Sequence, residues 1–267
     1  MRKPVALLLL CIHSILGIRP AVGGSRPNWA LPPRNPVTDY QLAGAYPADH
    51  DVVVVVRDRH DPPAGRYDVC YVNGFQAQAD ELNWWKSQHP NLLLKDAKGR
   101  PVVDRAWNEV LLDITTPGKR NELSNIVGAW SKQCFSKGYE AVEFDNLDSY
   151  SRSRGAITKA HAVDMATRLV TRAHREGLAV GQKNAAGPFT SGRVPFDFAV
   201  VESCSEFNEC KPYFAQYGDR VIMIEYRLDA FERACRQWPG RSILLADPGL
   251  TVRGDERHLR RHCPSVP

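Results

Sequence analysis

Short apolar runs alternate with longer amphipathic stretches along most of this chain of 267 residues. Helical spacing is clearest in residues 160–174, where Ala162, Met165, Leu169 and Ala173 recur, and a second helix is predicted around residues 121–135. The apolar runs have the length and continuity of strands that are buried on both faces. They fall at residues 40–42, 52–56, 68–72, 110–114, 141–144, 178–181, 198–201, 221–224 and 243–246. Strands that alternate with helices predict a parallel sheet covered on both faces.

The nine candidate strands predict an α/β fold, a (β/α)8 TIM-type barrel in which one additional strand is surplus or pairs outside the barrel. Only a short stretch containing proline separates the second strand from the third, which is too little for a crossover helix. A doubly wound open sheet is the alternative. No Gly-x-Gly-x-x-Gly sequence follows an early strand, which disfavours a dinucleotide site. We therefore expect one barrel domain without a cofactor.

The first 23 residues have the pattern of an export signal. Arg2 and Lys3 precede an apolar run, and small residues up to Gly23 offer a cleavage point. Residues 24–36 are rich in Pro, Gly and Arg and are interpreted as a linker, which leaves residues 37–267 as the single domain. No other segment is apolar enough to span a bilayer. We expect a secreted, extracellular monomer that does not contact a membrane once the signal is cleaved.

Six cysteines remain when Cys11 is removed with the signal, and an even number in an exported chain favours disulfides. Cys204 and Cys210 are near enough in sequence to close one loop. The pairing of the other four cysteines is left open. His258 and His262 have a spacing found in metal sites, but neighbouring arginines would repel a cation, so no metal site is predicted.

The charge of the chain gives little support to a nucleic-acid partner. Its formal net charge is +5, and the signal removes three basic residues and no acid, which leaves +2. The remaining basic bias lies near the C-terminus, in Arg253, Arg257, Arg260 and Arg261, and is interpreted as a solvated tail. No basic surface interleaved with aromatic residues is visible.

Polar side chains collect where the predicted strands end. In a parallel barrel these ends face one side, so the side chains would converge on one mouth. A single acid after a strand is more typical of a turn or a helix cap, but caps need not share a face. The residues concerned are Asn73, Asp113, Asp145, Lys183, Asn184, Glu202, Glu225, Tyr226 and Asp247, with Asp148 just beyond Asp145.

Paired carboxylates without a metal suit the cleavage of a glycosidic bond. One ionised carboxylate stabilises or attacks an oxocarbenium-like centre, and the other holds a proton for the leaving oxygen. A nearby Lys183 would help to keep the first one ionised. Candidate faces for sugar rings are Trp84, Trp85, Tyr150 and Tyr226, although Trp84 and Trp85 equally suit a helix with one ring packed inward. Serine chemistry is disfavoured because no Gly-x-Ser-x-Gly sequence occurs.

Residues 138–148, Gly-Tyr-Glu-Ala-Val-Glu-Phe-Asp-Asn-Leu-Asp, resemble the signature strand of glycoside hydrolase family 114, the endo-α-1,4-polygalactosaminidases. The resemblance continues through Val-Gly-Gln-Lys-Asn at 180–184, Glu-Ser-Cys-Ser-Glu-Phe-Asn-Glu-Cys at 202–210 and Ile-Glu-Tyr at 224–226. It extends from about residue 40 to residue 247. Residues 71–76 depart from it, because they replace the family's commoner small-residue turn.

The resemblance implies a secreted barrel hydrolase that acts on α-1,4-linked galactosamine polymers, with Asp145 and Glu202 as the catalytic pair. It also implies substrate roles for Lys183, Asn184 and Glu225, and a disulfide between the cysteines of the 202–210 segment. We predict Asp145 as the nucleophile and Glu202 as the general acid/base, with retention of configuration.

A cationic polymer gives the surplus acids a purpose, because galactosamine units without acetyl groups carry ammonium groups that an acidic cleft attracts. Acids predicted to line this cleft are Asp113, Asp148, Glu225 and Asp247. The full predicted substrate-binding set is Asn73, Asp113, Asp148, Lys183, Asn184, Glu225, Tyr226 and Asp247. The alternatives are a hydrolase of another α-linked polysaccharide and a non-catalytic polysaccharide-binding barrel.

Overall fold

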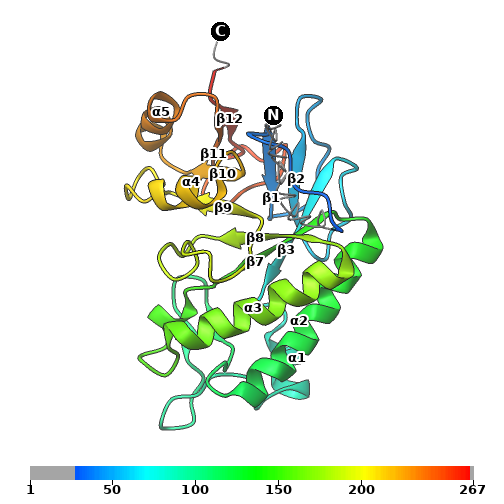
Figure 1. Ribbon diagram of the computed structural model, residues 1–267, viewed down its shortest axis with the longest axis vertical. Helices are drawn as coiled ribbons and strands as arrows, with labels where there is room; N and C mark the ends of the chain where they lie inside the picture. Colours follow the sequence, from blue (N-terminus) through cyan, green and yellow to red (C-terminus); the bar gives the residue numbers. More distant parts are fainter. Residues whose placement is uncertain (1–27, 265–267) are drawn as a thin grey trace, which may run out of the picture.

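A nine-stranded sheet forms the centre of the molecule in the computed structural model, which describes residues 28–264 (Figure 1). Eight of its strands are parallel and follow the order of the chain. They are β1 (Thr38–Gln41), β2 (Val54–Asp58), β3 (Tyr67–Asn73), β7 (Ala141–Asp145), β8 (Ala179–Lys183), β9 (Phe198–Glu202), β10 (Val221–Glu225) and β11 (Ser242–Ala246). The sheet curves until β1 meets β11, where Thr38 and Ser242 lie within hydrogen-bonding distance at 3.3 Å. This nearly closed barrel confirms the predicted TIM-type fold.

The ninth strand, β12 (Arg260–His262), pairs antiparallel with β11. The interpretation of this basic region as a solvated tail is wrong in this part, because the strand is anchored to the barrel. Arg260 donates to Asp49 at 2.8 Å and its side chain is only 10% exposed. A disulfide between Cys235 and Cys263 ties the end of the described chain to the preceding helix.

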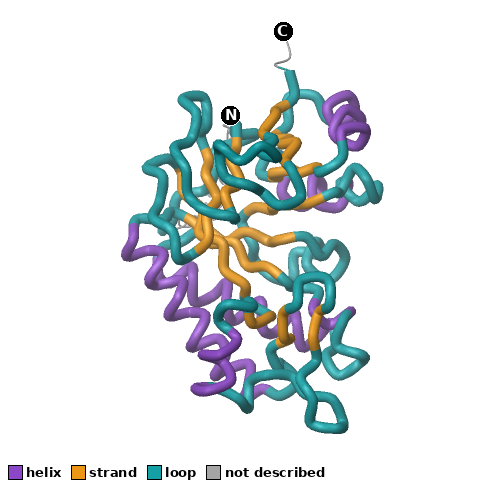
Figure 2. The backbone as a smooth tube through the Cα atoms, turned by 180° about the vertical axis from the view of Figure 1, so that it is seen from behind, coloured by secondary structure: helices purple, strands orange, loops and turns teal. Residues whose placement is uncertain are grey.

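A second, three-stranded antiparallel sheet interrupts the chain between β3 and the next long helix. It comprises β4 (Gln76–Ala77), β5 (Val103–Asp104) and β6 (Glu109–Leu111), with β6 in the middle, and α1 (Leu82–Gln88) lies between β4 and β5 in sequence. Figure 2 shows these short strands at the end of the molecule away from the chain termini. The run at residues 110–114 is therefore the additional strand, and it pairs outside the barrel.

Helices connect some of the barrel strands but not all. They are α2 (Pro117–Lys137), α3 (Lys159–Glu176), α4 (Lys211–Tyr217) and α5 (Leu228–Gln237), and a short 3-10 helix, η1 (Ser149–Ser151), precedes α3. Strands β2 and β3 follow one another without a helix, as their short connection predicts. In Figure 1, α2 and α3 run side by side in the lower part of the molecule, and α4 and α5 lie in the upper part, where they pack against β9, β10 and β11.

Local sequence explains where the two long helices begin and end. Thr116 accepts a hydrogen bond from the backbone of Lys119 at the start of α2, and Thr158 caps α3 in the same way. Both helices end at a glycine with positive φ, Gly138 at 99° and Gly177 at 89°. Their bounds agree with the predicted helices at 121–135 and 160–174.

Alternation along the strands divides the apolar side chains into two cores. Tyr71 on β3, Ala141 on β7 and Val200 on β9 belong to a cluster inside the barrel. Their neighbours in sequence, such as Val142 and Val201, pack outward against the helices. Because successive residues of a strand face opposite sides, each strand offers only every second residue to the barrel interior.

Close packing inside the barrel makes Gly181 on β8 a position where a larger residue will not fit. A Cβ atom there would lie 2.6 Å from two ring carbons of Phe198, which is fully buried. We expect Gly181→Ala to lower the free energy of unfolding by about 1–3 kcal/mol in urea titrations. Gly118→Ala is the matched control, because no atom lies within 4 Å of its Cβ position in the first turn of α2. Equal effects of the two substitutions would contradict this packing.

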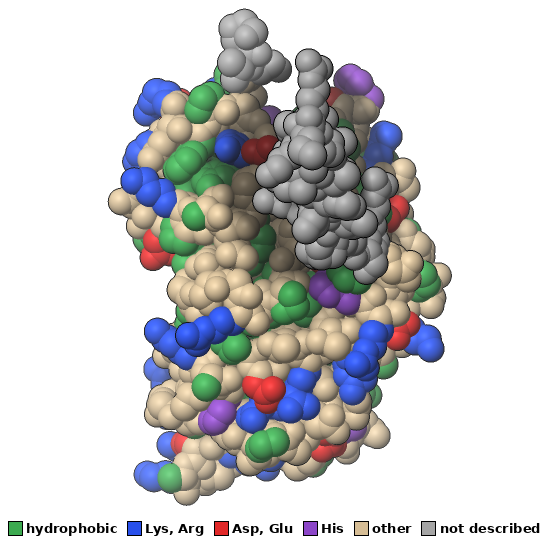
Figure 3. Space-filling view, viewed as in Figure 1, with side chains coloured by type: hydrophobic (Ala, Val, Ile, Leu, Met, Phe, Trp, Pro, Cys, Tyr) green, Lys and Arg blue, Asp and Glu red, His purple; other side chains and the backbone are tan. Residues whose placement is uncertain are grey.

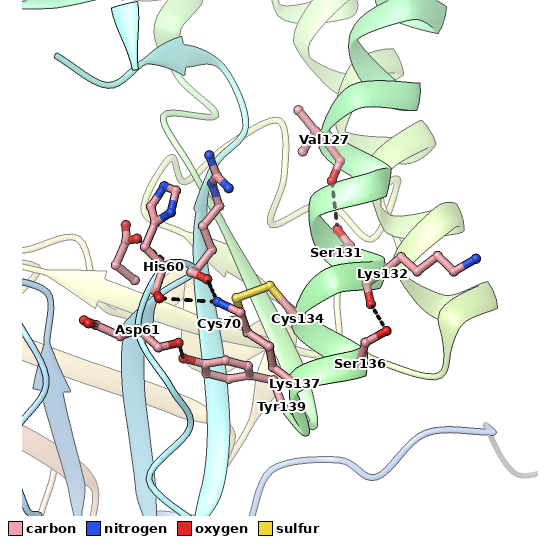
Figure 4. Close-up of a disulfide and its surroundings, with 12 residues drawn as sticks. His60, Asp61, Cys70, Val127, Ser131, Lys132, Cys134, Ser136, Lys137 and Tyr139 are labelled. Atoms are coloured by element: carbon pink, nitrogen blue, oxygen red, sulfur yellow. Dashed lines mark hydrogen bonds between the residues drawn. A yellow bond between two sulfur atoms is a disulfide. The ribbon is translucent and has the colours of Figure 1, made fainter. Parts of the chain in front are cut away.

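Three disulfides join the six cysteines of the described residues: Cys70–Cys134, Cys204–Cys210 and Cys235–Cys263. The first ties β3 to the last turns of α2 (Figure 4). Beside it, Lys137 donates to the backbone oxygen of His60, and Tyr139 donates to that of Asp61 at 3.1 Å. These contacts fix the end of α2 to the loop between β2 and β3. Such disulfides are typical of proteins that fold in an oxidising compartment.

The predicted signal at residues 1–23 lies outside the described residues, as do the first residues of the predicted linker. The described part of the linker runs along the barrel surface, where the ring of Trp29 stacks on His174 at 3.7 Å and Tyr67 donates to the backbone of Ala30 at 2.8 Å. None of the helices described in residues 28–264 combines the length and apolar character needed to cross a bilayer. On the face shown in Figure 3, Lys and Arg side chains are spread over the surface rather than gathered in one place.

Candidate active site

A cavity of about 370 Å³ lies at the carboxyl ends of the barrel strands. Inward-facing residues at or just after the ends of β3, β7, β8, β9 and β10 form its floor and walls. Its polar lining residues are Tyr71, Glu109, Asp145, Asn146, Asp148, Arg152, Lys183, Asn184, Glu202 and Tyr226. In barrels of this type, functional groups lie at this end of the strands.

Lys183 holds two carboxylates together across the floor of the cavity. Its Nζ lies 3.2 Å from Oδ2 of Asp145 and 3.1 Å from Oε2 of Glu202. The Lys183 side chain is 2% exposed, whereas those of Asp145 and Glu202 are 18% and 22% exposed. Burial alone lowers the pKa of an amine, but Asp145, Glu202 and a third acid raise the pKa of the Lys183 ammonium well above its usual range. The lysine therefore stays charged, and the two acids reach the solvent of the cavity.

Each of the two carboxylates also has two neutral donors. Asp145 accepts from the hydroxyl of Tyr71 at 2.9 Å and from the backbone N–H of Asn146 at 2.6 Å. Glu202 accepts from the side-chain amide of Asn184 at 3.1 Å and from the hydroxyl of Tyr226. Donors of this kind fix the orientation of each carboxylate.

Left-handed backbone turns follow directly after β7 and β8. Asn146 has a φ of 62° and Asn184 a φ of 45°. Asparagine adopts this conformation more readily than most residues. The turn at Asn184 aims its side chain at β9, where it also accepts from the backbone N–H of Glu202 at 2.7 Å. Such strained positions often hold functional groups in place.

A third acid, Glu143, lies beneath the pair inside the barrel and is not among the predicted site residues. It is fully buried on β7 and accepts from Tyr40 at 2.9 Å, and Lys183 in turn donates to the Tyr40 hydroxyl at 3.0 Å. Burial, together with Asp145, raises the pKa of Glu143 to about 7, although Lys183 opposes this. Its other oxygen has no hydrogen-bond partner among the described residues. The period-two spacing from Asp145 was the signal that could have identified it.

The raised pKa of Glu143 predicts a pH-dependent stability. Its folded pKa of about 7 exceeds the reference value of 4.5, so the folded protein binds this proton more tightly. The bound proton therefore contributes about 3 kcal/mol to the free energy of unfolding. This contribution is fully present below about pH 4.5 and is lost as the pH rises through 7. In urea titrations between pH 4.5 and 8, Glu143→Gln should reduce the decline of the unfolding free energy by this amount. A decline identical to that of the wild type would contradict the assignment.

Three of the predicted cleft acids do not line the cavity. Glu225 alternates with the inward-facing Ile224 and so points toward the helices, where it accepts from the backbone of Ser205 at 2.7 Å. Asp113 follows β6 of the second sheet and is paired with Lys119 at the start of α2. The third, Asp247, accepts backbone hydrogen bonds from the loop after β11, at residues 249, 251 and 259. These acids stabilise loops and helix ends.

The other predicted substrate residues lie in or next to the cavity. Asp148 lines it but forms a bidentate pair with Arg152, with both oxygens at 2.9 Å. Asn73 lies behind the wall, where it donates to Glu109 at 2.8 Å. Lys183, Asn184 and Tyr226 line the cavity as described above.

The predicted aromatic sugar faces are mostly elsewhere. Trp85 is fully buried in α1, and Trp84 packs against it and near Trp130, away from the cavity. Tyr226 lines the cavity, and so does Trp107 from the turn between β5 and β6. Trp107 and Glu109 were not among the predicted site residues, because only the return of the second sheet over the barrel brings them to the cavity.

This arrangement has the parts needed for acid/base and nucleophilic chemistry on a bound sugar. Two carboxylates face one cavity: Asp145 is held by three hydrogen-bond donors, and Glu202 by two donors and an ion pair with Lys183, whose ammonium group lies between them. Carboxylate pairs across a sugar-sized space are the usual machinery of glycoside hydrolysis.

Comparison with known proteins also indicates an enzyme that cleaves glycosidic bonds. Residues 19–264 match the model of Glycoside-hydrolase family GH114. None of the curated proteins matches the chain in sequence.

Three examples illustrate the solved structures that are similar in fold. Ega3 of Aspergillus fumigatus, in complex with galactosamine, has a TM-score of 0.68 and 22% identity over 83% of this chain and 95% of that one. The glycoside hydrolase domain of PelA from Pseudomonas aeruginosa has a TM-score of 0.57 and 18% identity, over 81% and 96%. The α-galactosidase TtGalA of Thermus thermophilus has a TM-score of 0.53 and 13% identity, over 84% and 60%. At these identities the similarity shows a shared fold.

Proposed function

Because the chain belongs to glycoside hydrolase family GH114, we propose that it is an endo-acting hydrolase of α-1,4-linked, galactosamine-containing polysaccharide. Asp145 acts as the nucleophile and Glu202 as the general acid/base. The observation that carries this proposal is the bridge from Lys183 to both carboxylates at 3.2 and 3.1 Å. The galactosamine bound in the structure of Ega3 supports the choice of sugar.

The contact of both carboxylates with one lysine nitrogen limits the separation of their nearest oxygens, and this is compatible with retention of configuration. Because a single nitrogen contacts both, Oδ2 of Asp145 and Oε2 of Glu202 are at most 6.3 Å apart, the sum of their two distances from it. Retaining glycosidases separate their carboxyl groups by about 5–5.5 Å, and inverting ones by about 6.5–9.5 Å to admit a water molecule. A first-formed product with inverted anomeric configuration, observed by NMR, would rule out retention.

The reaction then has two steps at one anomeric carbon. In the first, an oxygen of Asp145 bonds to that carbon as the glycosidic bond breaks, and Glu202 gives its proton to the leaving oxygen. In the second, Glu202 takes a proton from water, whose oxygen displaces Asp145. Lys183 and Tyr71 stabilise the negative charge of Asp145 when it is released.

A polymer with ammonium groups suits the charge of the cavity. Four acids line it, Glu109, Asp145, Asp148 and Glu202, against the two bases Arg152 and Lys183. The formal charge of the cavity is therefore negative, whereas that of the whole chain is +5. A cleft with a local field of this sign concentrates cationic substrates, and added salt weakens the effect.

The protein is proposed to be secreted. The support is the predicted signal in residues 1–23 together with three disulfides in the described residues, since such bonds persist in oxidising compartments. We propose that it acts as a monomer on extracellular polysaccharide.

The activity is tested by incubating purified protein with three polymers: de-N-acetylated α-1,4-galactosamine polymer, its N-acetylated form and a neutral α-galactan. We expect new reducing ends and short oligomers from a galactosamine polymer. Cleavage of the galactan alone would favour a different α-linked substrate. Saturable binding without new reducing ends would indicate a non-catalytic polysaccharide-binding barrel.

A further inference from the structure

The turn between β5 and β6 carries an aromatic ring and an acid to the rim of the cavity. Residues 105–108 form the turn, and Ala106 donates to Asp104 at 3.1 Å at its start. Trp107 is 68% exposed, and Glu109 is half-buried at the start of β6. Both line the cavity that contains Asp145 and Glu202. They belong to the second sheet, so they form a wall that the eight barrel strands do not supply.

Glu109 differs from the other cavity acids in the partners that it has. Asp145 and Glu202 share Lys183, and Asp148 is paired with Arg152. The hydrogen bonds of Glu109 within the described residues come from the neutral amides of Asn73 and Asn146, at 2.8 and 3.3 Å. Both are accepted by Oε2, so Oε1 is available to a ligand.

The surroundings of Glu109 leave its negative charge uncompensated. Burial raises the pKa of Glu109 to about 7, and Asp145 and Asp104 add to this, against the hydrogen bond from Asn73 and the charge of Arg152. Arg152 itself is already engaged, with contacts of 2.6 Å to Asp104 and 2.9 Å to Asp148. A positively charged group of a ligand would therefore be favoured near Glu109, because it would supply the positive partner that this carboxylate does not have.

We propose that Glu109 and Trp107 form a subsite for a hexosamine unit whose amino group is unacetylated. Glu109 accepts the ammonium group, and the indole of Trp107 packs against the apolar face of the ring. Aromatic side chains in binding sites offer such flat apolar surfaces, and an indole face also attracts cations. The subsite gives the protein a preference for de-N-acetylated over N-acetylated segments, since an acetamido group is neutral. The nature of the sugar rests on the proposed function.

The test measures binding rather than turnover, so it does not depend on the proposed activity. Asp145→Asn serves as the background, and calorimetry gives the affinity for an α-1,4-galactosamine oligomer and for its N-acetylated counterpart. We expect the galactosamine oligomer to bind more tightly. Adding Glu109→Gln, which keeps the shape and an acceptor for Asn73, should weaken its binding about 10-fold or more. Binding of the N-acetylated oligomer should change less than about two-fold.

Two further variants complete the design. Glu232→Gln removes the same charge from the exposed face of α5 and should change neither affinity. Trp107→Ala should weaken both oligomers, because ring packing does not depend on the amine. The proposal is overturned if Glu109→Gln weakens both oligomers equally or neither of them, or if neither oligomer binds. Failure of the wild type to cleave any polymer would refute the proposed activity alone.

Discussion

Asp145→Asn should abolish turnover, lowering kcat by about 10⁴-fold or more, while the protein stays folded. The amide cannot attack the anomeric carbon or carry the negative charge that the reaction requires, and loss of a nucleophile has effects of this size. Asparagine has nearly the same shape and still offers an oxygen to Tyr71 and Lys183. Release of reducing ends from galactosamine polymer, followed over time, measures the effect.

The control for this substitution is Asp51→Asn, which removes the same charge from an exposed position before β2. It should leave kcat unchanged. Circular dichroism and a cooperative unfolding transition establish that Asp145→Asn is folded. Turnover of the folded variant within ten-fold of the wild type would remove Asp145 from the role of nucleophile.

Lys183→Met should lower both activity and stability, because Lys183 supplies the positive charge among three acids. Its Nζ lies 3.6 Å from Glu143 and within 3.2 Å of Asp145 and Glu202. Leaving buried carboxylates without their partner costs about 3–5 kcal/mol of unfolding free energy at neutral pH. Loss of the charge that stabilises released Asp145 should lower kcat by about 10²–10³-fold.

The pH dependence distinguishes this electrostatic effect from a loss of packing. Burial already raises the pKa of Glu143 and Lys183 opposes this, so without Lys183 this acid binds its proton still more tightly than in the unfolded chain. The unfolding free energy of Lys183→Met should therefore be higher at low pH and should fall as the pH rises. Urea titrations should show a larger deficit for Lys183→Met at pH 8 than at pH 5. Lys132→Met, at an exposed position of α2, should show no deficit at either pH. A deficit of equal size at both values would indicate packing alone.

The fold was largely predictable because the barrel strands are apolar on both sides. Strands such as β10 and β11 contact the interior residues with one face and the helices with the other, so each appears as a continuous apolar run. The run at residues 110–114 has the same appearance but pairs antiparallel with β4 and β5. Apolar content alone does not distinguish a barrel strand from a strand of the second sheet.

The site was predictable in part, and alternation explains both the successes and the failures. Asp145, Lys183 and Glu202 end their strands on inward-facing positions, whereas Glu225 ends β10 on an outward-facing one. Counting in twos from the inward-facing Ile224 would have excluded Glu225. The same count back from Asp145 would have found Glu143.

The remaining site residues depend on long-range arrangement. Trp107 and Glu109 precede Asp145 by more than thirty positions, on a sheet whose placement over the barrel no local pattern encodes. Asp148 is in the cavity as predicted, but its pairing with Arg152 follows from the turn of the chain after β7. The sequence therefore indicates which residues could belong to the site, whereas the fold determines which side chains they contact.

We propose that Asp145 and Glu202 act on one anomeric carbon from a shared cavity. This proposal is tested most directly by mass spectrometry of Glu202→Gln incubated with an α-1,4-galactosamine oligomer that carries a reactive aryl leaving group. Such a group departs without acid assistance, while hydrolysis of the intermediate lacks its base. We expect a covalent glycosyl adduct that peptide mapping locates on Asp145. Release of the aryl group with no adduct and an inverted product, or an adduct on another residue, would contradict it.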